Sequence, residues 1–448
     1  MTRVTTPICD FAAAYEASGA MRLHMPGHKG HSFLGVEGRD LTEIDGADVL
    51  YDARGIIRES EQNARRLFGS GETLYSTEGS SLCIRAMLYL AALYAGSCGR
   101  RPLIAAARNA HKVFMTAAAL LDLDICWLFP KEAGSVVSCA LNLDQVEQVL
   151  QEEKPVALYV TSPDYLGNTA DLAALSKLCR KHDVLLMVDN AHGAYLKFLP
   201  ESRHPMDLGA DLCCDSAHKT LPVLTGGAYL HIANDAPEII RNHAQNALSL
   251  FASTSPSYLI LQSLDQANRY LALDDGQKLA EMCGWLEGMR CRLQTHGFEL
   301  AGDEPLKVTV QPKSIGWCGD EIAQRMQAEG MVCEFADPDF LVMMFTPEIS
   351  RTDVQRVTDW LCALPRKTPV MQKPPVLAKT IRRMSPREAV FSVQECLPVE
   401  RAVGRILASA SVNCPPAVPI VVCGEQIDAS AAACFRYYGI DKVYVVKE

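Results

Sequence analysis

The sequence predicts an α/β protein: a mostly parallel sheet with helices on both faces, followed by a smaller C-terminal α/β domain. Between residues 103 and 232, short apolar runs alternate with longer amphipathic stretches, a pattern typical of βαβ units. The run before Asp189 is continuously apolar, as expected of a strand buried on both faces. A second apolar stretch, Asp211–Asp215, runs into polar residues. Because open α/β sheets bind ligands beyond the carboxyl ends of their strands, these two ends predict one pocket.

The N-terminal residues are predicted to form an extended arm with loops and not a packed domain. Residues 7–20 have the apolar spacing of a short amphipathic helix. Three histidines, His24, His28 and His31, follow in a loop that contains Pro26 and Gly27. A metal site is one interpretation, but no carboxylate or cysteine lies between them. An active-site or interface loop is favoured.

The next segments predict a helix, a turn and a second helix. The helices are expected at residues 56–68 and 82–94, with Gly79-Ser-Ser81 opening the second one. Such a turn offers free backbone N–H groups, two hydroxyls and the positive end of a helix dipole, which together hold a phosphate. A plain N-cap serine is the alternative interpretation of the same residues.

The alternating region predicts the strands and helices of the sheet. Strands are expected at residues 103–107, 125–129, 156–161, 184–189, 211–215 and 226–232. The first intervening helix is expected to follow Arg108–Lys112 and to run through Leu121, and the others are expected at residues 143–151 and 171–182. Further helices at 259–273 and 276–296 lead away from this region.

The whole chain is predicted to contain several parts. They are an N-terminal arm (1–55), a large domain (56–275), a small α/β domain (276–364), a proline-rich linker (365–384) and a C-terminal domain (385–448). In the small domain, strands are expected at 307–311 and 340–345, and in the C-terminal domain at 418–423.

Composition narrows the possible partners. The net charge of −10 argues against nucleic acid as the main partner. The 17 cysteines are scattered without a Cys-x-x-Cys pair, which indicates a reduced, cytoplasmic protein. The N-terminus has no apolar signal core. No apolar run approaches the roughly 20 residues that span a bilayer, so we expect no membrane association.

Lys219 and Asp189 indicate a specific chemistry. Lys219 lies beside His218 and close to Ser216, just after a predicted strand. Partial burial lowers the pKa of a lysine, and a neutral lysine can form an imine with a carbonyl. Pyridoxal 5'-phosphate (PLP) needs such a lysine and a carboxylate on its pyridine nitrogen, which Asp189 would supply. A solvated loop lysine and a capping aspartate fit these two stretches equally well.

Eight motifs in order connect the chain to a known family. They are Leu23-His-Met-Pro-Gly-His-Lys-Gly30, Leu41-Thr-Glu-Ile-Asp-Gly46, Gly79-Ser-Ser81, Arg108-Asn-Ala-His-Lys112, Asp189-Asn-Ala-His-Gly193, Ser216-Ala-His-Lys219, Ser253-Thr-Ser-Pro256 and Ser385-Pro-Arg-Glu-Ala389. With these motifs the chain resembles the ornithine/lysine/arginine decarboxylases over nearly its whole length. The resemblance implies a PLP-dependent transferase fold of type I, with a seven-stranded-type sheet in a large PLP-binding domain. It also implies the compact form of the family, without an N-terminal wing domain.

The resemblance assigns catalytic and cofactor-binding roles to individual residues. Lys219 would bind PLP covalently, and Asp189 would pair with the pyridine nitrogen. His111 would stack on the ring, His192 would lie beside Asp189, and His218 would lie near the phosphate and the reacting carbon. No residue is expected to bind a metal.

The same resemblance implies a shared site in a homodimer or higher homo-oligomer. Ser80, Ser81 and Ser216 would hold the cofactor phosphate. The turn Ser253–Ser255, which contains Thr254, would reach the phosphate of the neighbouring subunit. We therefore expect each site to be built from two chains.

The implied function is decarboxylation of arginine, lysine or ornithine to an amine that serves as a polyamine precursor. Asn190 stands where many members of the family have glutamate, and residues 220–227 also differ, so the substrate is open. An aminotransferase, a lyase or a catalytically silent PLP-binding protein are the alternatives. A distal cation needs a carboxylate, and Glu43, Asp45 and Asp48 are the densest acidic cluster near a motif. These acids either line the partner's pocket or only cap turns.

Overall fold

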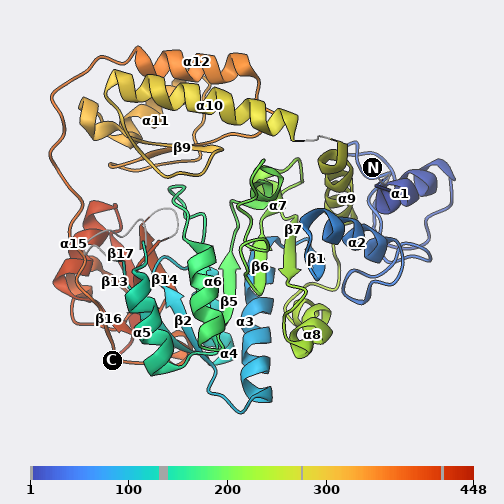
Figure 1. Cartoon of the computed structure of the whole chain (residues 1–448), viewed down its shortest axis with the longest axis horizontal. Coiled ribbons are helices and arrows are strands. Elements are labelled where there is room, and N and C mark those ends of the chain that lie inside the picture. Colours follow the sequence, from blue (N-terminus) through green and yellow to red (C-terminus); the bar gives the residue numbers. More distant parts are fainter. Residues whose placement is uncertain (1–3, 131–139, 274–275, 415–417) are drawn as a thin grey trace. The chain divides into compact units, whose positions relative to one another are not determined.

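One sheet has seven strands in the order β1-β7-β6-β5-β4-β2-β3, and its strands β1, β7, β6, β5 and β2 are labelled in Figure 1. Its strands are β1 (Glu72–Ser76), β2 (Leu103–Ala107), β3 (Asp124–Leu128), β4 (Ala157–Thr161), β5 (Leu185–Asp189), β6 (Leu212–Asp215) and β7 (Ala228–Ile232). Strand β2 runs parallel to β3 and β4, and β5 runs parallel to β6. Strand β7 is antiparallel to β6 and β1. The mostly parallel sheet confirms the predicted fold class.

The computed structural model describes residues 4–130, 140–273, 276–414 and 418–448. The chain forms two compact units. The first comprises Met1–Arg101 with Leu185–Gln277, and the second comprises Pro102–Val184 with Lys278–Glu448. The domain boundaries expected from the sequence stay a prediction.

The first unit contains β1, β5, β6 and β7, together with most of the residues proposed for the cofactor. Its longer helices are α1 (Pro7–Ala17), α2 (Ile56–Phe68), α3 (Gly79–Ser97), α8 (Glu238–Ser249) and α9 (Tyr258–Leu273). Two shorter elements are α7 (Ala217–Thr220) and a 3-10 turn, η2 (Ala194–Phe198). Helix α1 packs on α2 and α9, whereas α3 packs on α8 and on the strands of this unit.

Among the described residues, α3 alone is long and apolar enough to cross a membrane. At 19 residues it comes close to the length of a span. The expectation that no apolar stretch approaches this length therefore does not hold for α3. Half of its apolar window is buried within the protein, because the helix packs on α8 and on β1, β6 and β7. These contacts are those of a core helix.

The second unit begins with β2, β3 and β4 and the helices between them. These helices are α4 (Lys112–Leu121), α5 (Leu143–Glu153) and α6 (Leu172–Lys181). Each starts at a side chain that accepts a backbone N–H: His111, Asn142 and Asp171 respectively. Such caps satisfy N–H groups that have no partner inside the helix.

The second unit also holds a four-stranded antiparallel sheet with the order β10-β11-β9-β8. Its strands are β8 (Glu299–Ala301), β9 (Lys307–Gln311), β10 (Phe335–Ala336) and β11 (Leu341–Met344). The helices that accompany it are α10 (Gln277–His296), α11 (Gly319–Ala328) and α12 (Arg351–Cys362). The expected strand at 307–311 is confirmed without a shift at either end.

The C-terminal residues of the second unit form short paired strands around a small core. The strands are β12 (Ile381–Arg382), β13 (Gln394–Pro398), β14 (Ser411–Cys414), β15 (Val418–Val422), β16 (Glu425–Gln426) and β17 (Lys442–Val446). The helices are α13 (Pro386–Phe391), α14 (Val399–Ala402) and α15 (Ala429–Tyr437). Phe435, Ile420 and Val445 lie in the core. A buried ion pair of 2.7 Å joins Glu425 to Arg108, which follows β2.

Candidate active site

The carboxyl ends of β5 and β6 lie side by side, as the sequence predicted. Asp189, the last residue of β5, is in register with Cys214 of the parallel strand β6. Asp189 is only 2% exposed, and its Oδ1 accepts a hydrogen bond of 3.2 Å from the Ala191 N–H. Lys219 lies in α7, directly after β6. One edge of the sheet therefore carries both the acid and the lysine.

Lys219 is in hydrogen-bond contact with the segment that follows Asp189. Its Nζ lies 3.1 Å from Nε2 of His192. His192 is buried, whereas Lys219 is partly exposed. The amine can therefore hydrogen-bond to the imidazole nitrogen while it remains accessible to a small molecule.

Two serines meet at the start of α3, next to the lysine helix. The Ser216 hydroxyl donates to Ser80 Oγ over 2.8 Å, and Ser81 is the next residue of α3. Gly79 begins the helix with φ +71°, and a Cβ placed on it would meet no atom within 4 Å. The first N–H groups of a helix have no internal partner and carry positive partial charge, so this end suits a phosphate.

His218 points toward the backbone of the following loop. Its Nδ1 lies 2.9 Å from the Gly227 carbonyl oxygen, so Nδ1 carries a proton and donates it to this bond. Burial lowers the pKa of His218. The imidazole is consequently neutral near pH 7, and its Nε2 is left as an acceptor.

The turn Ser253–Ser255 is exposed in the isolated chain. The Ser253 N–H donates to Glu78 Oε1 over 2.7 Å, and Glu78 is the residue before α3. Thr254 therefore sits on an exposed turn that is tied to the start of α3. Glu78 was not singled out from the sequence, because only the folded chain brings residues 78 and 253 together.

His111 belongs to the second unit. It caps α4, and its Nδ1 accepts a bond of 3.3 Å from the Val113 N–H. The proton of a neutral His111 must therefore lie on Nε2. Its stacking role stays a prediction.

The three histidines of the N-terminal loop have separate surroundings. His24 Nε2 lies 2.6 Å from the Tyr15 hydroxyl, and His28 Nε2 lies 3.2 Å from Asp40 Oδ2. His31 is exposed. These different partners favour the interpretation as a structured loop over that of a shared ligand set.

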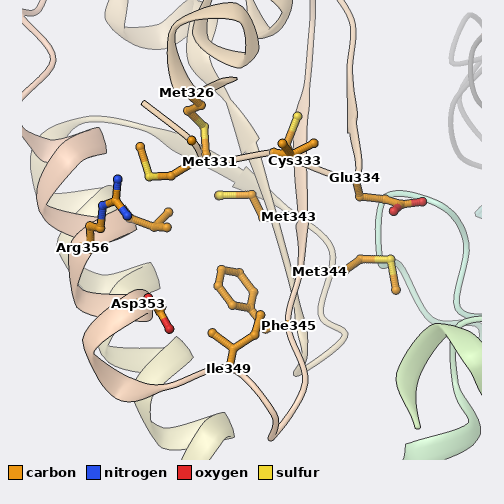
Figure 2. Close-up of a pocket in the computed structure, with 13 residues that line it drawn as sticks. Met326, Met331, Cys333, Glu334, Met343, Met344, Phe345, Ile349, Asp353 and Arg356 are labelled. Carbon is orange, nitrogen blue, oxygen red and sulfur yellow. The ribbon is translucent and has the colours of Figure 1, made fainter. Parts of the chain in front are cut away.

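A cavity of about 520 Å³ lies in the second unit, between α11, α12 and the strand β11 (Figure 2). Its lining is rich in methionine, with Met326, Met331, Met343 and Met344, and its charged members include Asp353 and Arg356. The lining includes none of the residues predicted to hold the cofactor.

Comparison with known families bears on the fold and on the class of enzyme. The major domain of Orn/Lys/Arg decarboxylases matches residues 6–294, more than half of the chain. The C-terminal domain of the same enzymes matches residues 370–442. The chain belongs to the Orn/Lys/Arg decarboxylase family.

Individual members of the family are similar to this chain over most of its length. Arginine decarboxylase of Bacillus subtilis is 29% identical over 95% of this chain and 92% of its own. Constitutive lysine decarboxylase of Escherichia coli is 22% identical over 84% of this chain and 67% of its own. The crystal structure of Francisella novicida lysine decarboxylase has a TM-score of 0.80 at 16% identity, covering 99% of this chain and 81% of that one. At this identity the last comparison bears on the fold alone.

Membership of the Orn/Lys/Arg decarboxylase family confirms two expectations. The chain is an amino-acid decarboxylase, and its substrate class is the basic amino acids. The fold of this family is also the one expected from the alternating strands and helices. The roles of the individual site residues stay predictions.

Asp48 of this family member has a structural role that its sequence did not reveal. Its Oδ1 accepts from the N–H groups of Val49 and Arg54, and its Oδ2 accepts from Gly55 and Ile57. Burial alone would raise the pKa of Asp48, but the backbone N–H groups lower it below its usual range. Asp48 thus caps the start of α2, which favours the capping interpretation of this residue. A role of Asp48 in substrate binding stays a prediction.

We expect Asp48→Ala to lower the free energy of unfolding by about 1–2 kcal/mol, the usual value of an N-cap carboxylate. Denaturant unfolding measures this change. Asp52→Ala is the matched control, because Asp52 pairs only with exposed Arg54 and exposed pairs contribute about 0–1 kcal/mol. Equal stability of the two variants, or a higher KM in Asp48→Ala, would restore the substrate-binding role.

Proposed function

We propose that this chain decarboxylates arginine with PLP bound covalently to Lys219, and that two chains share each active site. The proposal rests on the groups that lie together at the carboxyl ends of β5 and β6. Lys219 Nζ lies 3.1 Å from His192 Nε2, and the buried Asp189 is the last residue of β5. The serines at the start of α3 complete the set of groups that PLP requires.

The residues present fit PLP at three points. Asp189 is a buried carboxylate suited to a protonated pyridine nitrogen. Ser80 and Ser216, with the first turn of α3, are suited to the phosphate. Lys219 is a partly exposed amine suited to the aldehyde carbon. When bound, PLP supplies an electron sink for the bond between the substrate carboxylate and its α-carbon.

Three side chains would determine the charge, protonation and orientation of groups at the carboxyl ends of β5 and β6. The Asp189 carboxylate would keep the pyridine nitrogen of bound PLP protonated, because a buried anion stabilises a nearby cation. Nε2 of His192 lies 3.1 Å from Lys219 Nζ, and this contact would orient the amine toward the aldehyde carbon of a bound cofactor. His218 is neutral, because burial lowers its pKa, so it adds no positive charge near the reacting atoms.

Arginine is favoured by the comparison of relatives. The Bacillus subtilis arginine decarboxylase is 29% identical over 95% of the chain, against 22% over 84% for the Escherichia coli lysine decarboxylase. We therefore expect kcat/KM to be highest for arginine when arginine, lysine, ornithine and glutamate are compared with purified enzyme. A best substrate without a distal positive charge would contradict the proposal.

Exposed apolar side chains support the homodimer. Met21, Leu23, Phe33 and Leu34 are 78–86% exposed, all in the loop that follows α1. Exposed apolar patches of this kind mark interaction sites in soluble proteins. A second copy of the chain that covers this loop would remove these side chains from water.

Two acidic residues of the same arm are available to a substrate. Glu43 and Asp45 are exposed, unlike the capping residue Asp48. We expect Glu43→Gln to raise KM for arginine about three- to tenfold with little change in kcat, because attraction to a distal cation is equal in ground and transition states. Steady-state kinetics measures both constants. Glu201→Gln, another exposed glutamate of the first unit, is the control, and an equal KM in both variants would exclude Glu43.

The reaction product would be an amine that serves as a polyamine precursor. We propose that the enzyme works in the cytoplasm. Every cysteine whose side chain is described is free, and the net charge is −10. Free thiols are typical of a reducing compartment.

A further inference from the structure

In the first unit, a network of buried, hydrogen-bonded polar side chains lies on the face of the sheet opposite Asp189. Asp189 shares its face with Cys214, whose Sγ lies 3.7 Å from Asp189 Oδ1. Successive side chains of a strand point to opposite faces. Asp215, the residue after Cys214, therefore points away from the proposed cofactor side.

Asp215 collects hydrogen bonds from three separate segments. Its Oδ1 accepts 2.7 Å from Asn190 Nδ2, and its Oδ2 accepts 3.0 Å from His204 Nε2 and 3.2 Å from His231 Nε2. The Cys213 thiol also donates to Oδ1, over 3.5 Å. All four of Asp215, Asn190, His204 and His231 are 0% exposed. A buried network in which each donor faces an acceptor rigidifies its surroundings.

The contacts of the two histidine Nδ1 atoms show which ring nitrogen carries the proton. Nδ1 of His204 accepts 3.3 Å from the Met206 N–H, so the proton of His204 lies on Nε2 and is donated to Asp215. Nδ1 of His231 lies 2.8 Å from the Thr73 hydroxyl, and burial lowers the pKa of His231. Both imidazoles are therefore neutral donors.

Asp215 itself is an anion. Burial alone would raise its pKa, but the hydrogen bonds that His204 and His231 donate to it hold the pKa of this carboxyl well below its usual range. His204, Asp215 and His231 also have the composition of a metal site. A metal would need the lone pair on His204 Nε2, which the Met206 N–H bond leaves protonated. The contacts therefore favour a hydrogen-bonded anion.

The network connects the two strand ends that carry the proposed chemistry. Asn190 is adjacent to Asp189, and Asp215 is adjacent to Ser216, which contacts Ser80. We propose that Asp215 is a positioning residue of the cofactor site: it fixes the end of β5 against the end of β6, and so sets Asp189 relative to Lys219. This inference rests on the proposed use of PLP on Lys219.

The test compares Asp215→Asn with Asp265→Asn. Asp265 is another fully buried carboxylate of the first unit, but it binds the N–H groups of Ile8 and Cys9 at the start of α1. Each purified apoprotein is titrated with PLP, and the dissociation constant is read from absorbance. Melting temperature is measured on the same samples.

Both variants are expected to melt earlier than the wild type, since each loses a buried acceptor. Only Asp215→Asn is expected to bind PLP about tenfold more weakly or worse, and borohydride should fix less PLP on its Lys219. An unchanged dissociation constant in Asp215→Asn, at a lowered melting temperature, would overturn the positioning role.

Asn190→Ala serves if Asp215→Asn does not fold, because it removes one donor and keeps both histidine bonds. A rise of about threefold or more in the dissociation constant supports the proposal, and no rise overturns it. Failure of the proposed function looks different: the wild-type protein itself would then fix no PLP on Lys219.

Discussion

Lys219→Ala is expected to lower kcat by about four powers of ten or more, because the variant lacks the amine that forms and releases the bond to the cofactor. At about 1.4 kcal/mol per tenfold, this corresponds to about 5.5 kcal/mol of barrier. The fold should survive, since Lys219 is partly exposed in a short helix. Activity assays and far-ultraviolet circular dichroism measure the two properties.

Covalent labelling makes this prediction specific to one lysine. Borohydride reduction of the wild-type holoenzyme, followed by peptide mapping, should place PLP on Lys219 and nowhere else. Lys177→Ala is the control, because Lys177 is exposed on α6 and its loss should change neither labelling nor activity. Label on a different lysine would remove Lys219 from the mechanism.

Asp189→Asn is expected to retain PLP and to lose about three powers of ten in kcat. A neutral amide cannot keep the pyridine nitrogen protonated, so electrons from the breaking bond are accepted less readily. The loss corresponds to about 4 kcal/mol of barrier. Cofactor stoichiometry and kcat are measured on the same preparation.

The matched control makes the same chemical change at another carboxylate. Asp171→Asn alters a side chain that caps α6, and asparagine caps a helix about as well as aspartate. Its activity should equal that of the wild type. Turnover near the wild-type rate in Asp189→Asn would assign the pairing role to another group.

The strands around the proposed site could be predicted because burial made them continuously apolar. Strand β5 was expected at residues 184–189 and is observed at Leu185–Asp189. Strand β1 was missed, because its pattern is interrupted by Thr73 and Ser76, both fully buried. Thr73 is satisfied by His231 of β7, a partner that no local pattern reveals.

Some site residues could likewise be placed from local sequence patterns, whereas others could not. Lys219 and Asp189 follow apolar runs, so their position at the sheet edge could be read from the sequence. Asp48 was left with two interpretations and Asp215 was not singled out, because an aspartate that caps a helix and one that binds histidines look alike until the partners are known. Their roles depend on contacts between segments distant in the sequence.

The most direct test of the central claim is the product balance of the purified holoenzyme with arginine. Carbon dioxide and the corresponding amine are measured together with any keto acid. We predict one carbon dioxide and one amine for each arginine consumed, with no keto acid. Keto-acid formation would identify an aminotransferase, and the absence of turnover despite bound cofactor would identify a silent PLP-binding protein; either result would contradict the proposed function.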